Sequence, residues 1–155
     1  GVPRASVPIR DERGELLGVS LRRTDGDEEP RYVLSHKFPK DLVLYNLYRA
    51  KQMGGTVILV EGFKACWALH EAGYSNVVAC MGSVLTDGQF HLLVNSGVNR
   101  VVLLLDGDGA GRDGTVASSA KLHKAFQTTV ISLPDNKSPD DFDRVELNEY
   151  VALFV

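Results

Sequence analysis

The sequence is short of cysteine, of long apolar runs and of positive charge, and each shortage excludes a class of protein. Its two cysteines, Cys66 and Cys80, are too few for a disulfide framework or a zinc site made of four cysteines. No apolar stretch approaches the roughly 20 residues of a membrane-spanning helix, and the N-terminus lacks the features of a secretory signal. We therefore expect a cytoplasmic protein with two free core thiols and no membrane partner.

Negative charge slightly exceeds positive charge over the whole chain. The 155 residues include 17 Lys and Arg against 20 Asp and Glu, which gives a formal net charge of −3. Residues 1–50 hold nine basic and eight acidic side chains, whereas residues 51–155 hold eight and twelve. A surface that binds nucleic acid would therefore have to be a local patch.

The N-terminal third is predicted to be a small α+β subdomain. Alternating residues over 5–23, interrupted by turn residues, predict a β-hairpin, and a loop at 25–30 leads to a short extended piece at 31–34. Apolar residues near helical spacing predict a helix over 41–51. The glycine pair that follows suggests a division of the chain into domains 1–54 and 55–155.

From residue 56 onward, predicted strands and helices alternate. Short apolar runs rich in β-branched residues indicate four buried strands, at 57–60, 77–80, 101–105 and 129–133. Thr86 and Gln89 have the spacing of a capping box at the start of a helix. The expected helices are 63–72, one that opens at 86–89, 112–126 and the tail 139–155. This alternation predicts an α/β fold with a parallel four-stranded sheet flanked by helices.

Carboxylates follow three of the four predicted strands. Glu61 follows the first, Asp106 and Asp108 follow the third, and Asp135 and Asp140 come after the fourth. Because ligands of parallel sheets bind at the carboxyl ends of the strands, these side chains are expected along one edge. Neighbouring carboxylates resist ionising together unless a cation lies among them, and Mg²⁺ prefers oxygen ligands. The sequence therefore predicts a magnesium site at this edge.

Helix caps, a calcium loop and a dinucleotide site are the alternatives to a magnesium site. An acidic residue after a strand can cap the next helix, but capping does not explain three such residues at neighbouring strand ends. Residues 106–117 begin like a calcium-binding loop, yet Ala110 and Ala117 stand where ligands are needed. Residues 109–114 read G-x-G-x-x-G, but the adjacent carboxylates would repel the pyrophosphate of a dinucleotide. Glycines beside the acids leave room for a phosphate or a metal shell, and they are Gly62, Gly107 and Gly109.

Three stretches together are similar to a known family. Residues 60–64, 80–86 and 106–113 read VEGFK, CMGSVLT and DGDGAGRD. They resemble the TOPRIM domain, a Rossmann-like domain that bacterial primases share with topoisomerases and some nucleases. The third stretch is close to the form found in DnaG-type DNA primases. Residues 8–48 resemble the basic subdomain that precedes TOPRIM in those primases, so the resemblance covers nearly the whole chain.

The resemblance implies synthesis of short RNA primers on single-stranded DNA by metal-dependent nucleotidyl transfer. It implies that Glu61, Asp106 and Asp108 are catalytic and hold Mg²⁺ or Mn²⁺, and that Asp140 contributes to a second ion. Ser138 stands where these primases have the first aspartate of Asp-Pro-Asp, which leaves that second ion open. The expected partners are single-stranded DNA, nucleoside triphosphates and, through regions outside this sequence, a replicative helicase.

Basic residues near both acidic and aromatic side chains are candidates for contact with nucleic acid. Arg31 and Lys40 match basic residues that face template or nucleotide in the resembled family, and Lys37 lies between them. Tyr32 and Phe38 in the same stretch offer rings on which a base can stack. Lys64, near Glu61, is a candidate phosphate contact. Ordinary solvated surface charge remains the alternative for these residues. The full set of expected nucleic-acid or nucleotide contacts is Arg31, Lys37, Lys40, Lys64, Gly62 and Gly107.

We therefore expect the catalytic-core fragment of a divergent primase, from a phage or mobile element, with little or no activity by itself. A metal-dependent TOPRIM nuclease and a non-catalytic nucleic-acid-binding module remain open as alternatives. The leading basic segment is the feature that favours a primase over a nuclease.

Overall fold

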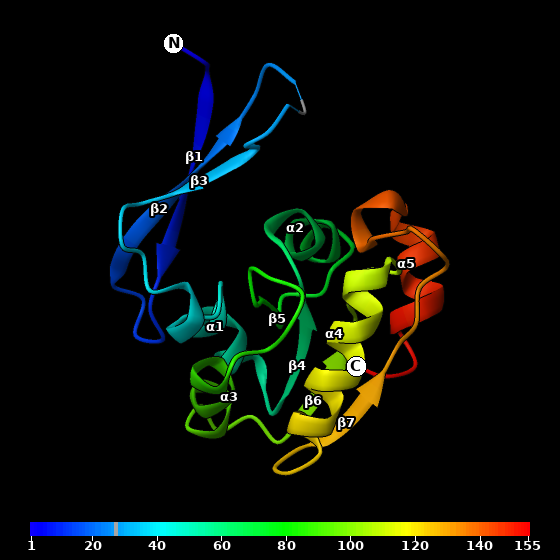
Figure 1. Ribbon diagram of the computed structural model, residues 1–155. Coiled ribbons are helices and arrows are strands. Elements are labelled where there is room, and N and C mark those ends of the chain that lie inside the picture. Colours follow the sequence, from blue (N-terminus) through cyan, green and yellow to red (C-terminus); the bar gives the residue numbers. More distant parts are fainter. Residues whose placement is uncertain (27) are drawn as a thin grey trace.

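Two sheets organise the computed structural model, which describes residues 1–26 and 28–155 (Figure 1). The first sheet is antiparallel, in the order β1-β2-β3, and the second is parallel, in the order β5-β4-β6-β7. The strands are β1 (Arg4–Arg10), β2 (Leu16–Arg23), β3 (Tyr32–Leu34), β4 (Thr56–Val60), β5 (Val77–Ala79), β6 (Arg100–Leu103) and β7 (Gln127–Val130). The predicted α/β class, with a four-stranded parallel sheet and a small first subdomain, is confirmed.

Helices connect and cover the parallel strands. The longer ones are α2 (Phe63–Glu71), α3 (Asp87–Val94), α4 (Gly109–Leu122) and α5 (Arg144–Val151). Short turns of helix complete the set: α1 (Leu47–Ala50), η1 (Lys40–Leu42), η2 (Lys51–Met53) and η3 (Pro139–Asp141). None of the helices that the structure describes is long and apolar enough to cross a membrane.

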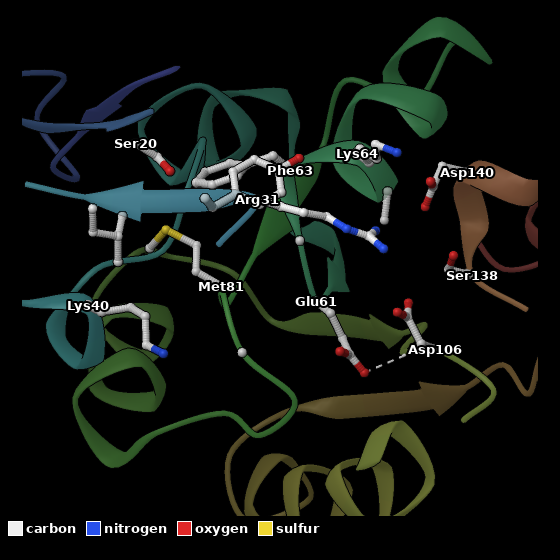
Figure 2. Close-up of a pocket in the computed structure, with 15 residues that line it drawn as sticks. Ser20, Arg31, Lys40, Glu61, Phe63, Lys64, Met81, Asp106, Ser138 and Asp140 are labelled. Atoms are coloured by element: carbon white, nitrogen blue, oxygen red, sulfur yellow. Dashed lines mark hydrogen bonds between the residues drawn. The ribbon is translucent and has the colours of Figure 1, made fainter. Parts of the chain in front are cut away.

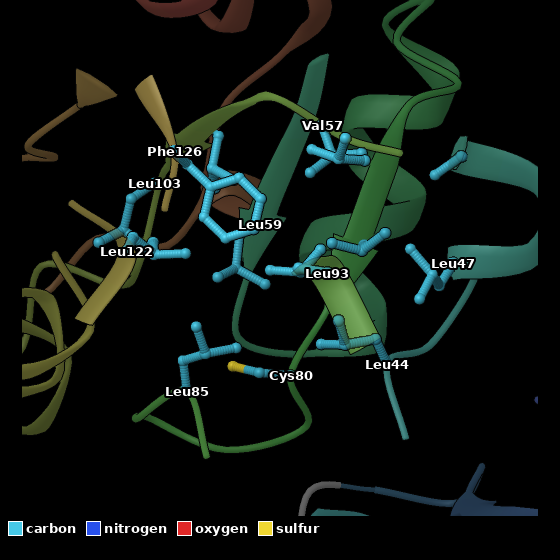
Figure 3. Close-up of a cluster of buried hydrophobic side chains, with 14 of the residues drawn as sticks. Leu44, Leu47, Val57, Leu59, Cys80, Leu85, Leu93, Leu103, Leu122 and Phe126 are labelled. Atoms are coloured by element: carbon cyan, nitrogen blue, oxygen red, sulfur yellow. The ribbon is translucent and has the colours of Figure 1, made fainter. Parts of the chain in front are cut away.

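The parallel sheet is buried on both faces because its central strand is apolar on both. On one face, Val57 and Leu59 of β4 pack in a cluster with residues of α1, α3 and α4 (Figure 3). On the other face, Ile58 and Val60 pack with residues of α2 and α5. This two-sided burial explains why the sequence shows a continuous apolar run here instead of an alternating one.

The first sheet packs against the start of α2. Val7 and Ile9 of β1 are buried in a cluster with Val43 and Phe63, and Phe63 is the first residue of α2. The helix that opens the parallel half of the molecule therefore also supports the antiparallel sheet. This contact holds Phe63 in place, and Phe63 forms part of the wall of a cavity between the two sheets.

The predicted helix over 41–51 is wrong for its first half. Val43 has extended backbone angles, and Tyr45 forms an isolated antiparallel bridge with Ala79, in which each residue's N–H donates to the other's carbonyl. The apolar side chains near helical spacing are instead buried from an extended segment and a single helical turn. Leu44 and Leu47 belong to the same cluster as β4 and β6. The division between 1–54 and 55–155 stays a prediction, and residues 44–50 supply core to the parallel sheet.

Other predicted bounds differ by a few residues. The capping box of Thr86 and Gln89 is confirmed at the start of α3. Strands β6 and β7 begin one and two residues before the predicted positions, and α4 begins at Gly109, three residues early. The predicted hairpin is present, whereas the predicted loop at 25–30 includes residue 27, which lies outside the described residues. The early start of α4 matters for the site because it makes Asp108 the N-cap.

Candidate active site

The two central strands of the parallel sheet end in carboxylates. β4 pairs with β6, and the chain passes from β4 outward to β5 on one side and from β6 outward to β7 on the other. In open sheets this point of reversal forms a crevice outside the carboxyl ends of the strands, where ligands bind. Glu61 follows β4, and Asp106 follows β6 after two further residues. The order of the strands therefore places the two side chains at the crevice.

Glu61 and Asp106 are in contact (Figure 2). The backbone N–H of Asp106 donates a hydrogen bond to Oε1 of Glu61 at 3.3 Å. Oδ1 of Asp106 is buried and has no hydrogen-bond partner among the described residues. Because a buried polar atom without a partner is costly, this oxygen marks a position where a ligand would be stabilising.

Burial and mutual repulsion make both carboxyls hard to ionise. Burial, and secondly the charge of Asp106, raise the pKa of Glu61 to about 7. Burial, and secondly the charges of Asp108 and Asp140, raise the pKa of Asp106 to about 6. A cation at this point would relieve both effects, because it favours the charged form of each carboxyl.

Asp108 has a structural role that the sequence also allowed. It is the N-cap of α4, and its Oδ1 accepts a hydrogen bond from the N–H of Gly111 at 2.7 Å. Within the part of the chain that the structure describes, no three acidic, histidine or cysteine side chains converge closely enough to hold one metal ion. Glu61 and Asp106 are the pair that the structure brings together, and a role for Asp108 as a metal ligand stays a prediction.

A cavity of about 420 Å³ lies between the two sheets and contains this pair (Figure 2). The parallel half contributes Glu61, Asp106 and, from the start of α2, Lys64. The first subdomain contributes Arg31, just before β3, and Lys40, the first residue of η1. The cavity thus has an acidic floor and basic side chains around it. The lining also includes Ser20, Tyr32, Phe63, Met81, Ser138 and Asp140.

Comparison with known proteins agrees with this geometry. Residues 58–143 match a family described as Toprim-like. The chain belongs to the Toprim-like family. Its resemblance to the DnaG-type primases is likewise confirmed by relatives and by solved structures.

Three similar proteins show which part of a primase the Toprim-like chain matches. It is 37% identical over 147 residues to the DNA primase of Clostridium acetobutylicum, covering 91% of this chain and 24% of that protein. It matches the crystal structure of the zinc-binding and RNA polymerase domains of Aquifex aeolicus primase with 34% identity and a TM-score of 0.81, over 97% of this chain and 40% of that one. The structure of a DnaG primase catalytic domain bound to single-stranded DNA matches with 31% identity and a TM-score of 0.81. The match covers 97% of this chain and 50% of that one. The chain thus spans about a quarter of the length of such a curated relative.

Asp140 and Ser138 lie at the rim of the cavity of this Toprim-like chain. Both line it, and the charge of Asp140 is one cause of the raised pKa of Asp106. Ser138 stands at the N-cap position of η3, and its N–H and its hydroxyl donate to Oδ2 of Asp141 at 2.8 and 3.2 Å. Asp140 as a ligand of a second ion stays a prediction. Asp135 lies elsewhere, paired with Arg112 on the surface.

Two of the predicted contacts are not among the residues that line the cavity. Lys37 is exposed and lies outside its lining, as does Gly107. A Cβ at Gly107 would lie 2.1 Å from the carbonyl oxygen of Pro134, so packing of the neighbouring loop explains the glycine. At Gly62, in contrast, a Cβ would meet no described residue within 4 Å, and this glycine does line the cavity. Roles for Lys37 and Gly107 in binding stay predictions.

Ser20 and Met81 are among the residues of the cavity wall that sequence reasoning missed. Ser20 is fully buried in β2, and its hydroxyl has no partner among the described residues. Met81 has a positive φ of 57°, and its N–H donates to the carbonyl of Glu61 at 2.7 Å. Only the assembly of the two sheets brings Ser20 to the wall of the cavity that also holds the carboxylates, so no local pattern indicates it. Met81 directly follows a predicted strand, and ligands bind at the ends of such strands. Its position could therefore have indicated that it lies at the cavity.

Proposed function

We propose that this chain carries the nucleotidyl-transfer site of a DNA primase, which joins ribonucleotides along a single-stranded DNA template. The observation that supports this most is the composition of the cavity. Glu61 and Asp106 form its floor, while Arg31 and Lys40 approach from the first subdomain. Polyanionic triphosphates require cations around them, and carboxylates in the same space require a metal between acid and phosphate.

The residues present fit Mg²⁺ or Mn²⁺. The buried Oδ1 of Asp106, which has no partner among the described residues, and the raised pKa values of Glu61 and Asp106 are features that a divalent cation compensates. Glu61 and Asp106 would hold the ion, with Asp108 and Asp140 as further proposed ligands. When bound, such an ion neutralises phosphate charge and polarises a phosphoryl oxygen.

The chain's own residues then position the substrates. Arg31 and Lys40 would bind phosphate oxygens, and Lys64 would do so from the start of α2. Phe63 is buried against the first sheet and keeps the spacing between the basic and acidic walls. Holding reactants in a fixed arrangement and neutralising their charge are the main contributions a protein makes to phosphoryl transfer.

Single-stranded DNA and nucleoside triphosphates are the proposed partners. The catalytic domain of a similar DnaG primase has been solved with single-stranded DNA bound, and the likeness extends over nearly this whole chain. A helicase as a further partner, and a location in the cytoplasm, stay predictions.

Metal binding by the carboxylate pair tests the proposal directly. We expect Mn²⁺ to broaden the NMR signals of residues around the crevice, and Glu61→Gln or Asp106→Asn to abolish that broadening. Asp135→Asn is the matched control, because this exposed carboxylate lies outside the cavity. If the broadening persists unchanged in both cavity variants, Glu61 and Asp106 do not form the metal site.

The reaction itself separates a primase from the alternatives. With single-stranded DNA, ribonucleoside triphosphates and Mn²⁺, we expect at most weak synthesis of short RNA products by this fragment, and Asp106→Asn should abolish it. Cleavage of the DNA strand in place of synthesis would favour a nuclease. Binding of DNA without Mn²⁺-dependent binding of triphosphates would favour a non-catalytic module.

A further inference from the structure

A second groove lies across an aromatic wall from the cavity. The centre of this wall is Phe63, whose ring centroid lies 5.5 Å from that of Tyr32, 4.8 Å from that of Tyr45 and 6.1 Å from that of Trp67. Phe63 and Tyr32 line the cavity, whereas Tyr45 and Trp67 line a different hollow. The wall therefore separates two spaces on either side of the start of α2.

The second space consists of two adjoining hollows. One has a volume of about 350 Å³ and the other about 150 Å³. They share Tyr45, Asn46 and Arg49, so they adjoin beside α1, and we name the two hollows together the α1 groove. It extends from Arg10 at the end of β1, past Tyr48, to Trp67 on α2. None of these residues belongs to the acidic crevice.

Positive charge dominates this groove. Arg10 and Arg49 form no ion pair with the described residues. Glu71, at the far end, is the one carboxylate among the described residues that line either hollow. Two arginines that share a recess without an acidic partner attract an anion, because the planar guanidinium matches phosphate oxygens well.

Aromatic rings accompany these arginines. The guanidinium of Arg49 lies 5.1 Å from the ring centroid of Tyr48, and Arg49 is exposed. Trp67 is partly exposed, and its indole N–H donates to the hydroxyl of Tyr45 at 3.1 Å, which fixes the ring plane. Rings beside guanidinium groups provide stacking surfaces and phosphate contacts together, and single-stranded nucleic acid is the ligand that uses both.

We propose that the α1 groove binds a segment of single-stranded nucleic acid, separately from the catalytic cavity. Arg10 and Arg49 contact its phosphates, and the partly exposed Trp67 stacks on one of its bases. A free phosphate would leave the rings unused, and an acidic peptide would not match their flat faces. The proposal rests on the proposed function in one respect, that the chain handles nucleic acid.

Trp67 makes the groove directly observable, since it is the chain's only tryptophan. Titration with an unlabelled decamer of either DNA or RNA should quench its fluorescence, and anisotropy of the labelled decamer should give the affinity. Reversal of one groove charge, Arg49→Glu, should weaken binding by about tenfold or more and remove the quenching. Arg49→Ala should reduce the slope of log affinity against log salt by about 0.7, one phosphate contact for a single strand.

Arg13→Glu is the matched control, because it makes the same change of charge at an exposed position outside the groove. Three results would overturn the proposal: no binding of either decamer, binding without quenching, or equal affinities for Arg49→Glu and Arg13→Glu. Comparison of the DNA and RNA decamers shows which strand binds more tightly.

Failure of the groove and failure of the catalytic site give different results. Arg49→Glu should leave Mn²⁺ broadening at Glu61 and Asp106 intact, since neither residue lines the groove. Loss of oligonucleotide binding with that broadening retained supports the groove alone. Quenching that depends on Arg49, in a chain that shows no Mn²⁺ binding, would retain the groove and reject the proposed function.

Discussion

Individual carboxylates in this molecule have very different roles despite similar positions in the sequence. Glu61 and Asp106 are half-buried at the crevice, whereas Asp108 is exposed and caps α4. Sequence analysis located all three because each follows a buried strand. It could not decide between ligand and helix cap, because that depends on where the next helix begins, and α4 begins three residues before the predicted start.

The raised pKa values predict how stability depends on pH. Glu61 and Asp106 keep their protons in the folded chain up to pH values of about 7 and about 6, above their ordinary pKa values of 4.5 and 3.8. Between these limits the folded form binds more protons than the unfolded form, so the free energy of unfolding falls as pH rises through this range. At pH values below this range, the two carboxyls are protonated in both forms, and their contribution to the free energy of unfolding is fully present. Urea unfolding without divalent cations, measured between pH 4 and 8, should show this decrease.

Variants and metal test the cause of that decrease. Asp106→Asn should make the curve flatter, while Glu149→Gln, an exposed change elsewhere, should leave its shape unchanged. Mn²⁺ should restore stability above pH 7, because it binds the folded, ionised pair and not the unfolded chain. A pH profile that is identical in wild type and Asp106→Asn would show that this pair does not cause the effect.

At the scale of elements, α4 is fitted closely against the loops of the crevice. A Cβ at Gly111 would lie 2.1 Å from the carbonyl oxygen of Asp106, and one at Gly114 would lie 1.7 Å from that of Ser83. The G-x-G-x-x-G pattern, considered and rejected as a dinucleotide site, therefore includes two glycines required for packing. Sequence spacing alone cannot distinguish a glycine that admits a ligand from one that admits a neighbouring loop.

This packing predicts opposite outcomes for two glycines of the same helix. Gly114→Ala should destabilise the chain by at least about 1–3 kcal/mol, because backbone on both sides must move. The new Cβ in Gly109→Ala meets none of the residues that the structure describes within 4 Å, so this change should be neutral or stabilising by up to about 1 kcal/mol, through helix propensity. Denaturant unfolding of both variants measures the difference. Equal stabilities would contradict the described contact between α4 and Ser83.

Gln89 joins three segments that sequence analysis treated separately. Its side chain is buried, and Nε2 lies 2.7 Å from the carbonyl oxygen of Cys80, 3.0 Å from that of Val43 and 3.2 Å from that of Lys40. An amide has two such hydrogens, so the two shorter bonds are the principal ones. The capping box indicated only its other role, because these carbonyls are distant in sequence. They also explain why residues near 43 are extended and not helical.

Removing this amide should be costly. Gln89→Met keeps the volume but leaves buried carbonyls unpaired, and we expect a loss of about 1–3 kcal/mol in the free energy of unfolding. Gln52→Met is the matched control: its amide also donates to a carbonyl, that of Tyr48 at 2.7 Å, but the residue is exposed. For Gln52→Met we expect the free energy of unfolding to change by no more than about 0.5 kcal/mol. Similar losses in the two variants would mean that burial of the Gln89 bonds contributes little.

For the whole molecule, the site exists because the antiparallel sheet packs beside the acidic edge of the parallel sheet, and residues of both halves line one cavity. The alternation of strands and helices was sufficient to predict the parallel sheet and its acidic edge. It was not sufficient to predict which basic residues of the first subdomain face that edge, since this depends on the packing of Val7, Ile9 and Val43 around Phe63. Lys40 faces the cavity, and Lys37, three residues earlier, does not line it.

That difference between two lysines is the sharpest test of how the halves are assembled. Lys40→Ala should weaken Mn²⁺-dependent binding of ATP by about tenfold, because a phosphate contact in a partly enclosed site is removed. Lys37→Ala removes the same charge at an exposed position outside the cavity, so it should have a much smaller effect, and one that disappears as salt screens it. Both lysines leave the parallel sheet untouched, so unfolding curves should match the wild type within about 0.5 kcal/mol. Isothermal titration with ATP at low and at moderate salt measures the contrast. If the two variants bind ATP equally well, Lys40 does not contact the nucleotide in the cavity. The packing around Phe63 would then not bring the basic residues of the first subdomain to the bound ATP.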